Sequence, residues 1–174
     1  MGAGPGVRVV RAGVERLPDV EPLARALHAH HTTVDPAIPG IPPRTEDEWW
    51  RVRRARYAAW LADEEESFVL LAEIDGRAIG YAFVTIHGED DSHETGERFA
   101  ELQSLAVLPS HRGVGIGTRL LHQVYREVRA IGVEEMVIGV LATNELALRL
   151  YEREGFRPWV VLTMGKVPDV GPSA

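Results

Sequence analysis

Apolar residues in the first part of the chain predict two helices. Between residues 14 and 31 they recur at the spacing of a helix that buries one face, so we expect a helix there. Thr45 with Glu48 three residues later is the pattern of a capping box, which predicts that a second helix begins at this point. The inner side of that helix is expected to carry Trp49, Val52, Ala59 and Trp60. Between the helices, four prolines within residues 35–43 predict a structured loop or an extended stretch.

The pattern then changes to that of a sheet. Residues 68–74 and 78–86 are apolar runs joined by Asp75-Gly76, a strong short-range hairpin signal. A third strand is predicted to end at Val107, after a polar loop. Further elements follow: a helix with an apolar face from Ile116 to Ile131, a strand at 133–140, a short helix at 144–153 and a last strand at 156–166. Helices that alternate with a mostly antiparallel sheet predict an α/β or α+β layered fold.

Length and patterning indicate one domain. The chain has 174 residues, and neither an internal repeat nor a shift in composition separates it into parts. We therefore expect a single domain at residues 7–167, with a flexible N-terminus at 1–6 and a flexible C-terminal tail at 168–174.

The composition excludes several kinds of function. With 19 basic and 26 acidic residues the formal charge is -7, which argues against nucleic acid as a partner and suits a cationic substrate, although an acidic surface also aids solubility. The chain has no cysteine, so disulfides, thiolate nucleophiles and cysteine-bound metals are excluded. No apolar run is long enough to span a membrane and no signal core is present, so a cytoplasmic location is expected.

The most informative stretch runs from Leu105 to Thr118. An apolar strand ends at a proline, passes through three alternating glycines and enters the amphipathic helix. The first N–H groups of a helix have no partner within it, and the helix dipole adds about half a positive charge there. Glycines let such amides surround a pyrophosphate, and Arg112 adds a guanidinium. The stretch therefore predicts an anion site.

Other glycine motifs fit this turn less well. A dinucleotide fingerprint needs G-x-G-x-x-G, whereas the third glycine here falls one place early. A P-loop needs a lysine that this turn lacks. A turn that only allows tight packing is the remaining alternative, and it leaves the preceding strand, the arginine and the following helix unexplained.

Two motifs together resemble one known family. The pattern R-x-x-G-x-G at residues 112–117, after a Leu-x-Val-x-Pro strand, is similar to the acyl-CoA motif of the GNAT superfamily of N-acetyltransferases. Asn144, Ala147 and the run L-Y-E-R-E-G-F at residues 150–156 resemble that superfamily's downstream motif. The resemblance is strong over about residues 101–158 and weak over the first 65 residues.

The resemblance implies a GNAT-like sheet that is splayed beside a bulge, where the pantetheine arm of acetyl-CoA fills the gap. Three strand residues are expected to bind the arm through their backbone: Leu105, Ala106 and Val107. The pyrophosphate cradle is expected to comprise Arg112, Gly113, Val114, Gly115, Ile116, Gly117 and Thr118. Asn144 resembles the asparagine that bonds the cofactor's amide-bearing arm. An asparagine also suits a helix N-cap, a role that Thr143 could fill instead.

Two side chains are candidates for catalysis. Tyr151 matches the tyrosine that in many family members lies near the thioester sulfur and protonates the leaving thiolate, and a core aromatic is the alternative reading. Glu101 lies where some members carry a catalytic glutamate. Strand alternation predicts that Glu101, Gln103 and Leu105 share one face, so Glu101 would project beside the cleft. An exposed strand glutamate, with a water relay or a loop histidine such as His87 as the base, is equally open.

The expected activity is therefore transfer of an acetyl group from acetyl-CoA to a primary amine by direct attack. The amine belongs to a small or peptidic acceptor. A non-catalytic acyl-CoA sensor and a transferase for longer acyl chains are the alternatives. No metal is expected, because His28, His30 and His31 lack a carboxylate that completes a site. Dimers are common in the family, and the sequence leaves a homodimer open.

Overall fold

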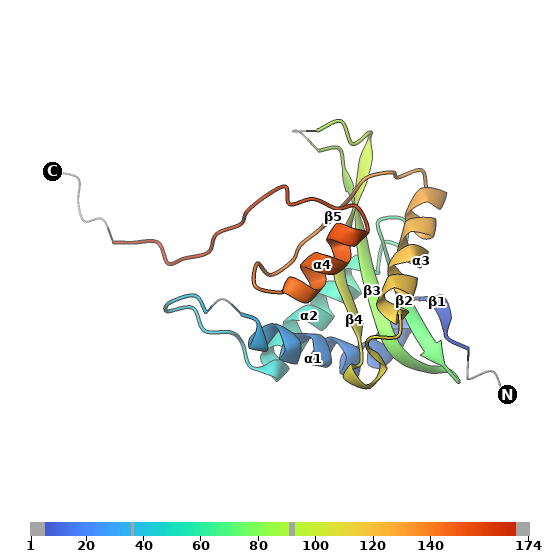
Figure 1. Ribbon diagram of the computed structural model, residues 1–174, viewed down its shortest axis with the longest axis horizontal. Helices are drawn as coiled ribbons and strands as arrows, with labels where there is room; N and C mark the ends of the chain where they lie inside the picture. Colours follow the sequence, from blue (N-terminus) through green and yellow to red (C-terminus); the bar gives the residue numbers. More distant parts are fainter. Residues whose placement is uncertain (1–5, 36, 91–92, 170–174) are drawn as a thin grey trace.

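A five-stranded sheet organises the protein (Figure 1). The computed structural model describes residues 6–35, 37–90 and 93–169. The strands lie side by side in chain order: β1 (Arg8–Ala12), β2 (Ser67–Ile74), β3 (Arg77–Gly88), β4 (Arg98–Val107) and β5 (Met136–Ile138). The first four strands are antiparallel to their neighbours, and β5 runs parallel to β4. The predicted layered fold with a mostly antiparallel sheet is confirmed.

Helices cover both faces of this sheet. The helical elements are η1 (Val14–Arg16), α1 (Leu17–Thr33), α2 (Glu46–Trp60), η2 (Pro109–His111), α3 (Ile116–Ala130) and α4 (Glu145–Arg153). Helices α1 and α2 pack on one face of the sheet and α3 on the other, because the apolar residues of the strands divide between two buried clusters. Tyr151 of α4 packs against the cluster that contains α3.

Each buried cluster follows from a helical apolar stripe. On α3 the stripe of Ile116, Leu120, Leu121, Val124 and Val128 is buried against the sheet, as the sequence predicts. On α1 the corresponding residues are Leu17, Val20, Leu23, Ala24 and Leu27. Residues 14–16 form a 3-10 turn rather than the first turn of α1, and Pro18 lies at the start of the helix, where its missing N–H costs nothing.

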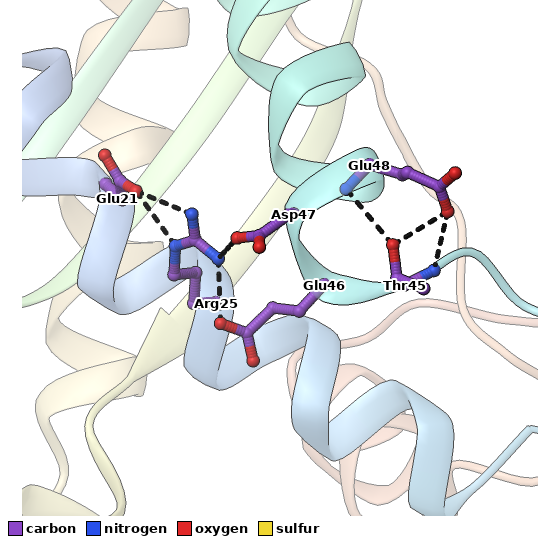
Figure 2. Close-up of polar contacts among 6 residues, drawn as sticks. All are labelled: Glu21, Arg25, Thr45, Glu46, Asp47 and Glu48. Atoms are coloured by element: carbon purple, nitrogen blue, oxygen red, sulfur yellow. Dashed lines mark hydrogen bonds and ion pairs between the residues drawn. The ribbon is translucent and has the colours of Figure 1, made fainter.

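Arg25 joins α1 to the first turn of α2 (Figure 2). Its guanidinium contacts Glu21 on its own helix at 2.9 Å, and it reaches Glu46 and Asp47 on α2 at 2.9 and 2.8 Å. Exposed ion pairs contribute little stability singly. Their effect here is to fix the direction in which α2 leaves the long loop after α1.

The start of α2 is confirmed and its inner side is corrected. Thr45 Oγ1 accepts from the N–H of Glu48, and the Glu48 carboxylate accepts from the N–H of Thr45, which is the predicted capping box (Figure 2). The buried residues of α2, however, are Trp50 and Tyr57, whereas Ala59 is exposed. Trp49 and Trp60 pack against the same cluster as predicted, so the correction removes Ala59 and adds Trp50 and Tyr57.

Two strand predictions are corrected in the last part of the chain. The predicted strand at 133–140 is only the short β5, because it pairs with β4 over three positions and then departs. The predicted last strand at 156–166 has no strand conformation, and its apolar side chains, among them Val161 and Leu162, are exposed. Strand patterning alone does not make a strand, because the backbone also needs a neighbour to pair with.

The expected flexible ends fall largely outside the described residues. Residues 1–5 and 170–174 lie outside them, as does Pro36 of the proline-rich loop. Within the described part, no helix is long and apolar enough to cross a membrane.

Candidate active site

A bulge in β4 divides the strand into two halves. Val84 of β3 pairs with Leu102, and the preceding Phe83 pairs with Ser104, so Gln103 has no residue opposite it. A bulge of this kind inserts one extra residue and resets the alternation of side chains along the strand. Ala100 and Leu102 belong to the cluster on the α3 face, whereas Ala106 belongs to the cluster on the α1 and α2 face.

The changed alternation along β4 corrects the expectation that Glu101 and Leu105 share one face of the sheet. Leu105 packs with the cluster on the α3 face, whereas Glu101 is paired with Thr85, on the α1 and α2 face. Glu101 and Leu105 therefore lie on opposite faces of the sheet, although simple alternation places them together. Glu101 points to the side of the two N-terminal helices, and Gln103 lies with it, because its amide donates to Thr85 Oγ1 at 2.9 Å.

A buried hydroxyl network holds the bulge. Ser104 Oγ donates to the carbonyl oxygen of Gln103 at 2.7 Å and lies 2.6 Å from the Tyr57 hydroxyl. The Tyr57 hydroxyl also lies 3.2 Å from that of Tyr81, and both tyrosines are fully buried. Burial raises the pKa of Tyr81 well above its usual value, so this phenol stays protonated. The sequence analysis singled out neither Ser104 nor Tyr81.

Strands β4 and β5 separate immediately at the bulge. Their pairing covers Ala100 with Met136 through Leu102 with Ile138 and then stops. From Gln103 to Val107, β4 has β3 on one side and no strand of the described residues on the other. The three residues predicted to bind a pantetheine arm, Leu105, Ala106 and Val107, lie along this open edge. An extended ligand could pair with their backbone as an added strand.

The turn after β4 has a row of bare amides, which are backbone N–H groups without an acceptor among the described residues. Gly113 and Gly115 have φ of 79° and 84°, the left-handed region that favours glycine, and Gly115 is the N-cap of α3 without a side-chain cap. The first helical hydrogen bond runs from the N–H of Arg119 to the carbonyl of Gly115. Among the residues that the structure describes, none accepts a hydrogen bond from the N–H groups of residues 113–118.

The surface over these amides is open. A Cβ atom added to Gly113 or Gly115 would meet no atom within 4 Å, and one added to Gly117 would lie 3.9 Å from Cγ2 of Val107. Arg112 is exposed beside them, and its Nε donates to the carbonyl oxygen of Val107 at 2.9 Å. This bond fixes the guanidinium between the strand end and the glycine turn. The arrangement suits an oxyanion that binds several amides and one arginine.

Asn144 caps α4, which is one of the two roles left open for it by the sequence. The Asn144 Oδ1 accepts from the N–H of Ala147 at 3.3 Å, and Asn144 is buried. Thr143 instead donates its hydroxyl to the carbonyl oxygen of Val34, which ties this loop to the end of α1. The cap occupies Oδ1 only, so the Asn144 amide nitrogen keeps its donors for another partner.

Tyr151 lies on α4 with its ring in the α3-side cluster and 6.2 Å from the ring of Phe156. Burial raises the pKa of Tyr151 to about 12, so its hydroxyl is protonated at neutral pH. No described residue hydrogen-bonds to this hydroxyl. A protonated phenol without an internal partner can donate a proton to a group that enters the cleft.

Tyr125 on α3 is the neighbouring phenol. Its hydroxyl is buried and has no hydrogen-bond partner among the described residues. Burial raises the pKa of Tyr125 above its usual value, with Glu154 and Tyr151 adding to the effect. Tyr125 contacts the rings of His122 and Phe156 and so belongs to the packing of α3 against the end of α4.

Glu101 is paired with a histidine. Its Oε2 lies 3.1 Å from Nε2 of His87 on β3, and both side chains are about one-third exposed. The same Nε2 lies 2.8 Å from Thr85 Oγ1, and the His87 ring stacks on Phe99 at 5.2 Å. The site therefore contains a carboxylate, an imidazole and a threonine in direct contact on the α1 and α2 face.

The three histidines of α1 contact neighbouring rings and do not converge on one point. His28 is buried and stacks on Trp49 at 4.7 Å, and His30 lies 6.3 Å from His31 between ring centres. Burial, aided by the neighbouring histidines and Arg53, lowers the pKa of His31 to about 4, so it is neutral at neutral pH. Within residues 6–35, 37–90 and 93–169, no group of three His, Asp or Glu residues could hold a metal ion.

Comparison with known proteins agrees with this geometry. The family model described as Acetyltransferase (GNAT) family matches residues 26–156, which is more than half of the chain. The protein therefore belongs to the GNAT acetyltransferase family, as the two sequence motifs predict.

Individual relatives share about a third of their residues with this chain, or fewer. An uncharacterized N-acetyltransferase of Mycobacterium tuberculosis is 35% identical over 103 residues, which cover 59% of this chain and 60% of that protein. The GCN5-related N-acetyltransferase of Ralstonia eutropha JMP134 has the same fold, with a TM-score of 0.73, 21% identity and coverage of 95% and 100% of the two chains. The aminoglycoside N-acetyltransferase AAC(6')-Iy, solved in complex with CoA, gives a TM-score of 0.71 at 20% identity, with 96% and 98% covered.

The hydroxyl network at the bulge can be tested by stability. Tyr57→Phe removes one hydrogen-bond partner from each of the buried Tyr81 and Ser104 hydroxyls, so we expect a loss of about 1–3 kcal/mol in the free energy of unfolding. Tyr125→Phe is the matched control, because it removes a buried hydroxyl that has no partner, and it should be neutral or stabilising. Urea unfolding of both variants measures the difference. Equal losses in the two variants would contradict the network.

Proposed function

We propose that the protein transfers the acetyl group of acetyl-CoA to a primary amine. The observation that carries this proposal is the conjunction of a row of unpartnered amides at residues 113–118 with an open strand edge from Gln103 to Val107. The first feature suits a diphosphate and the second an extended amide-bearing chain, and coenzyme A contains both in sequence.

The residues present fit this cofactor. The amides of residues 113–118 and the guanidinium of Arg112 would hold the diphosphate. The backbone of Leu105, Ala106 and Val107 would pair with the pantetheine arm, and the amide nitrogen of Asn144 would donate to it from the other side of the gap. Acetyl-CoA supplies the thioester whose acyl carbon the amine attacks.

Tyr151 is proposed as the general acid. Its phenol is protonated at neutral pH, since burial raises its pKa to about 12, and none of the described residues hydrogen-bonds to its hydroxyl. It can therefore give its proton to the departing thiolate. Direct attack by the amine, without an acyl-enzyme, accords with the absence of cysteine from the chain.

The acceptor must lose a proton before or during its attack. Glu101 and His87 lie together on the face of the sheet that α1 and α2 cover, so we propose that the acceptor amine enters from that side and that this pair receives the proton. The net charge of -7 favours an acceptor that is cationic in solution.

Thiol release with acetyl-CoA across a panel of amines tests the function. The panel contains a polyamine, an aminoglycoside, free amino acids and a peptide with a free N-terminus, and at least one of them should give amine-dependent release. Gly117→Glu should abolish binding of CoA in calorimetry, because it adds a negative charge beside the diphosphate site without a left-handed φ to strain the fold.

Gly117→Ala is the matched control and should bind CoA nearly as wild type does, since its methyl group lies in ordinary contact with Val107. Stabilisation by acetyl-CoA without thiol release for any amine would indicate a sensor of acyl-CoA instead of an enzyme. No binding of any coenzyme A species would contradict the proposal as a whole.

The role of Tyr151 has its own test. Tyr151→Phe should lower kcat by about 10²–10⁴-fold, the range for loss of a general acid, and leave the Kd of acetyl-CoA nearly unchanged. Tyr125→Phe alters the adjacent phenol and should leave kcat as it is. An unchanged kcat in Tyr151→Phe would remove this residue from the acid role.

A further inference from the structure

One ring nitrogen of His87 contacts two side-chain oxygens. Its Nε2 lies 3.1 Å from Oε2 of Glu101 and 2.8 Å from Oγ1 of Thr85. Thr85 is buried, and its Oγ1 already accepts from the amide of Gln103, the bulged residue of β4. The ring plane is set by Phe99, which stacks on it from the paired strand. His87 is therefore fixed at one nitrogen and on one ring face.

These contacts determine which nitrogen carries the proton. An ionised carboxylate only accepts hydrogen bonds, so a nitrogen that contacts it must be the donor. Nε2 of neutral His87 is then the N–H, and Nδ1 carries the free lone pair. Among the described residues, none hydrogen-bonds to Nδ1 of His87.

We propose that Nδ1 of His87 is the general base and that Glu101 acts through it as a positioning residue. This inference rests on the proposed acetyl transfer. A carboxylate that binds one imidazole nitrogen leaves the other free to take a proton and stabilises the imidazolium that results. The structure thus assigns to Glu101 the role of orienting His87. The family resemblance instead implies that this glutamate removes the proton itself.

The proton balance is complete. The acceptor reacts as the neutral amine, after its ammonium form has released one proton to solvent. As the amine nitrogen forms its bond to the acyl carbon, its N–H bond breaks and the proton passes to Nδ1 of His87. The bond from the acyl carbon to sulfur breaks, and the thiolate takes the proton of Tyr151. Solvent then accepts the proton from His87 and returns one to Tyr151.

Other charged groups near His87 are engaged elsewhere. On β4, Arg98 lies 3.3 Å from Glu66, the residue before β2. In the loop after β3, Asp90 lies 3.7 Å from His93. Glu101 is thus the charged group that contacts the His87 ring among the described residues.

The test is the pH profile of kcat with the best amine of the thiol-release panel, at saturating acetyl-CoA and amine. Activity should fall on acidification, because a protonated base cannot accept the proton of the amine. His87→Gln keeps an amide that can donate to Glu101 but offers no base. It should lower kcat by about 10²–10⁴-fold and abolish this acidic limb.

Glu101→Gln distinguishes His87 from Glu101 as the general base. Loss of the carboxylate leaves the base in place but no longer oriented, so the acidic limb should persist, with a decrease in kcat of roughly tenfold or less. If Glu101 itself takes the proton, Glu101→Gln removes the limb and His87→Gln keeps it, which would overturn the inference. The inference also fails if both variants keep the limb and the rate, as a water relay predicts.

His122→Gln is the matched control. His122 forms the same kind of pair with Glu154, at 2.9 Å, on the other face of the sheet, and its loss should leave the acidic limb in place. Thermal unfolding and the affinity for acetyl-CoA should be alike in all variants.

The tautomer has a readout that needs no acceptor. In ¹⁵N-labelled protein, long-range ¹H–¹⁵N correlations of the imidazole, assigned by their absence in His87→Gln, should show His87 protonated at Nε2 at neutral pH. Protonation at Nδ1 would overturn the inference whether or not the acetyl transfer is found. If no amine is acetylated, the proposed function fails while this observation still stands on its own.

Discussion

The extra residue at Gln103 is the constraint on which the rest of the site depends. Before the bulge, β4 has a strand on each side and turns Glu101 toward α1 and α2. After it, the strand loses its β5 neighbour and leads along an open edge to the glycine turn. A bulge leaves polar backbone unpaired. The Ser104 hydroxyl donates to the carbonyl oxygen of Gln103, and the Tyr57 hydroxyl holds Ser104 in place.

The two halves of β4 fit the two reactants of the proposed acetyl transfer. The open edge and the bare amides of residues 113–118 form one continuous hydrogen-bonding track on the chain, which suits a long cofactor with a diphosphate at one end. The pair of Glu101 and His87 faces the other side of the sheet, beneath α1 and α2. Reactants that approach from opposite faces can meet only at the gap, and holding them there lowers the entropy cost of their encounter.

Local signals in the sequence predicted most of the fold. The capping box at Thr45, the Asp75-Gly76 hairpin and the stripe of α3 act within a few residues and are confirmed. Contacts over long distances were not predictable in the same way. The 156–166 strand was therefore wrong, and the inner side of α2 was right at Trp49 and Trp60 but missed Trp50 and Tyr57. The bulge did leave a trace, because the core positions Leu102 and Leu105 are three apart instead of two. The glycine turn at the start of α3 was predictable from its spacing, whereas the contact of His87 with Glu101 requires the register of β3 on β4.

The central claim concerns the N–H groups of residues 113–118, for which the described part of the chain supplies no acceptor. Hydrogen–deuterium exchange resolved to single residues, with and without CoA, tests it most directly. The N–H groups of residues 113–118 should exchange rapidly in the free protein and become strongly protected when CoA is bound, while the exposed first turn of α2 is unchanged. Saturation with CoA that leaves residues 113–118 exchanging as fast as before would contradict the account.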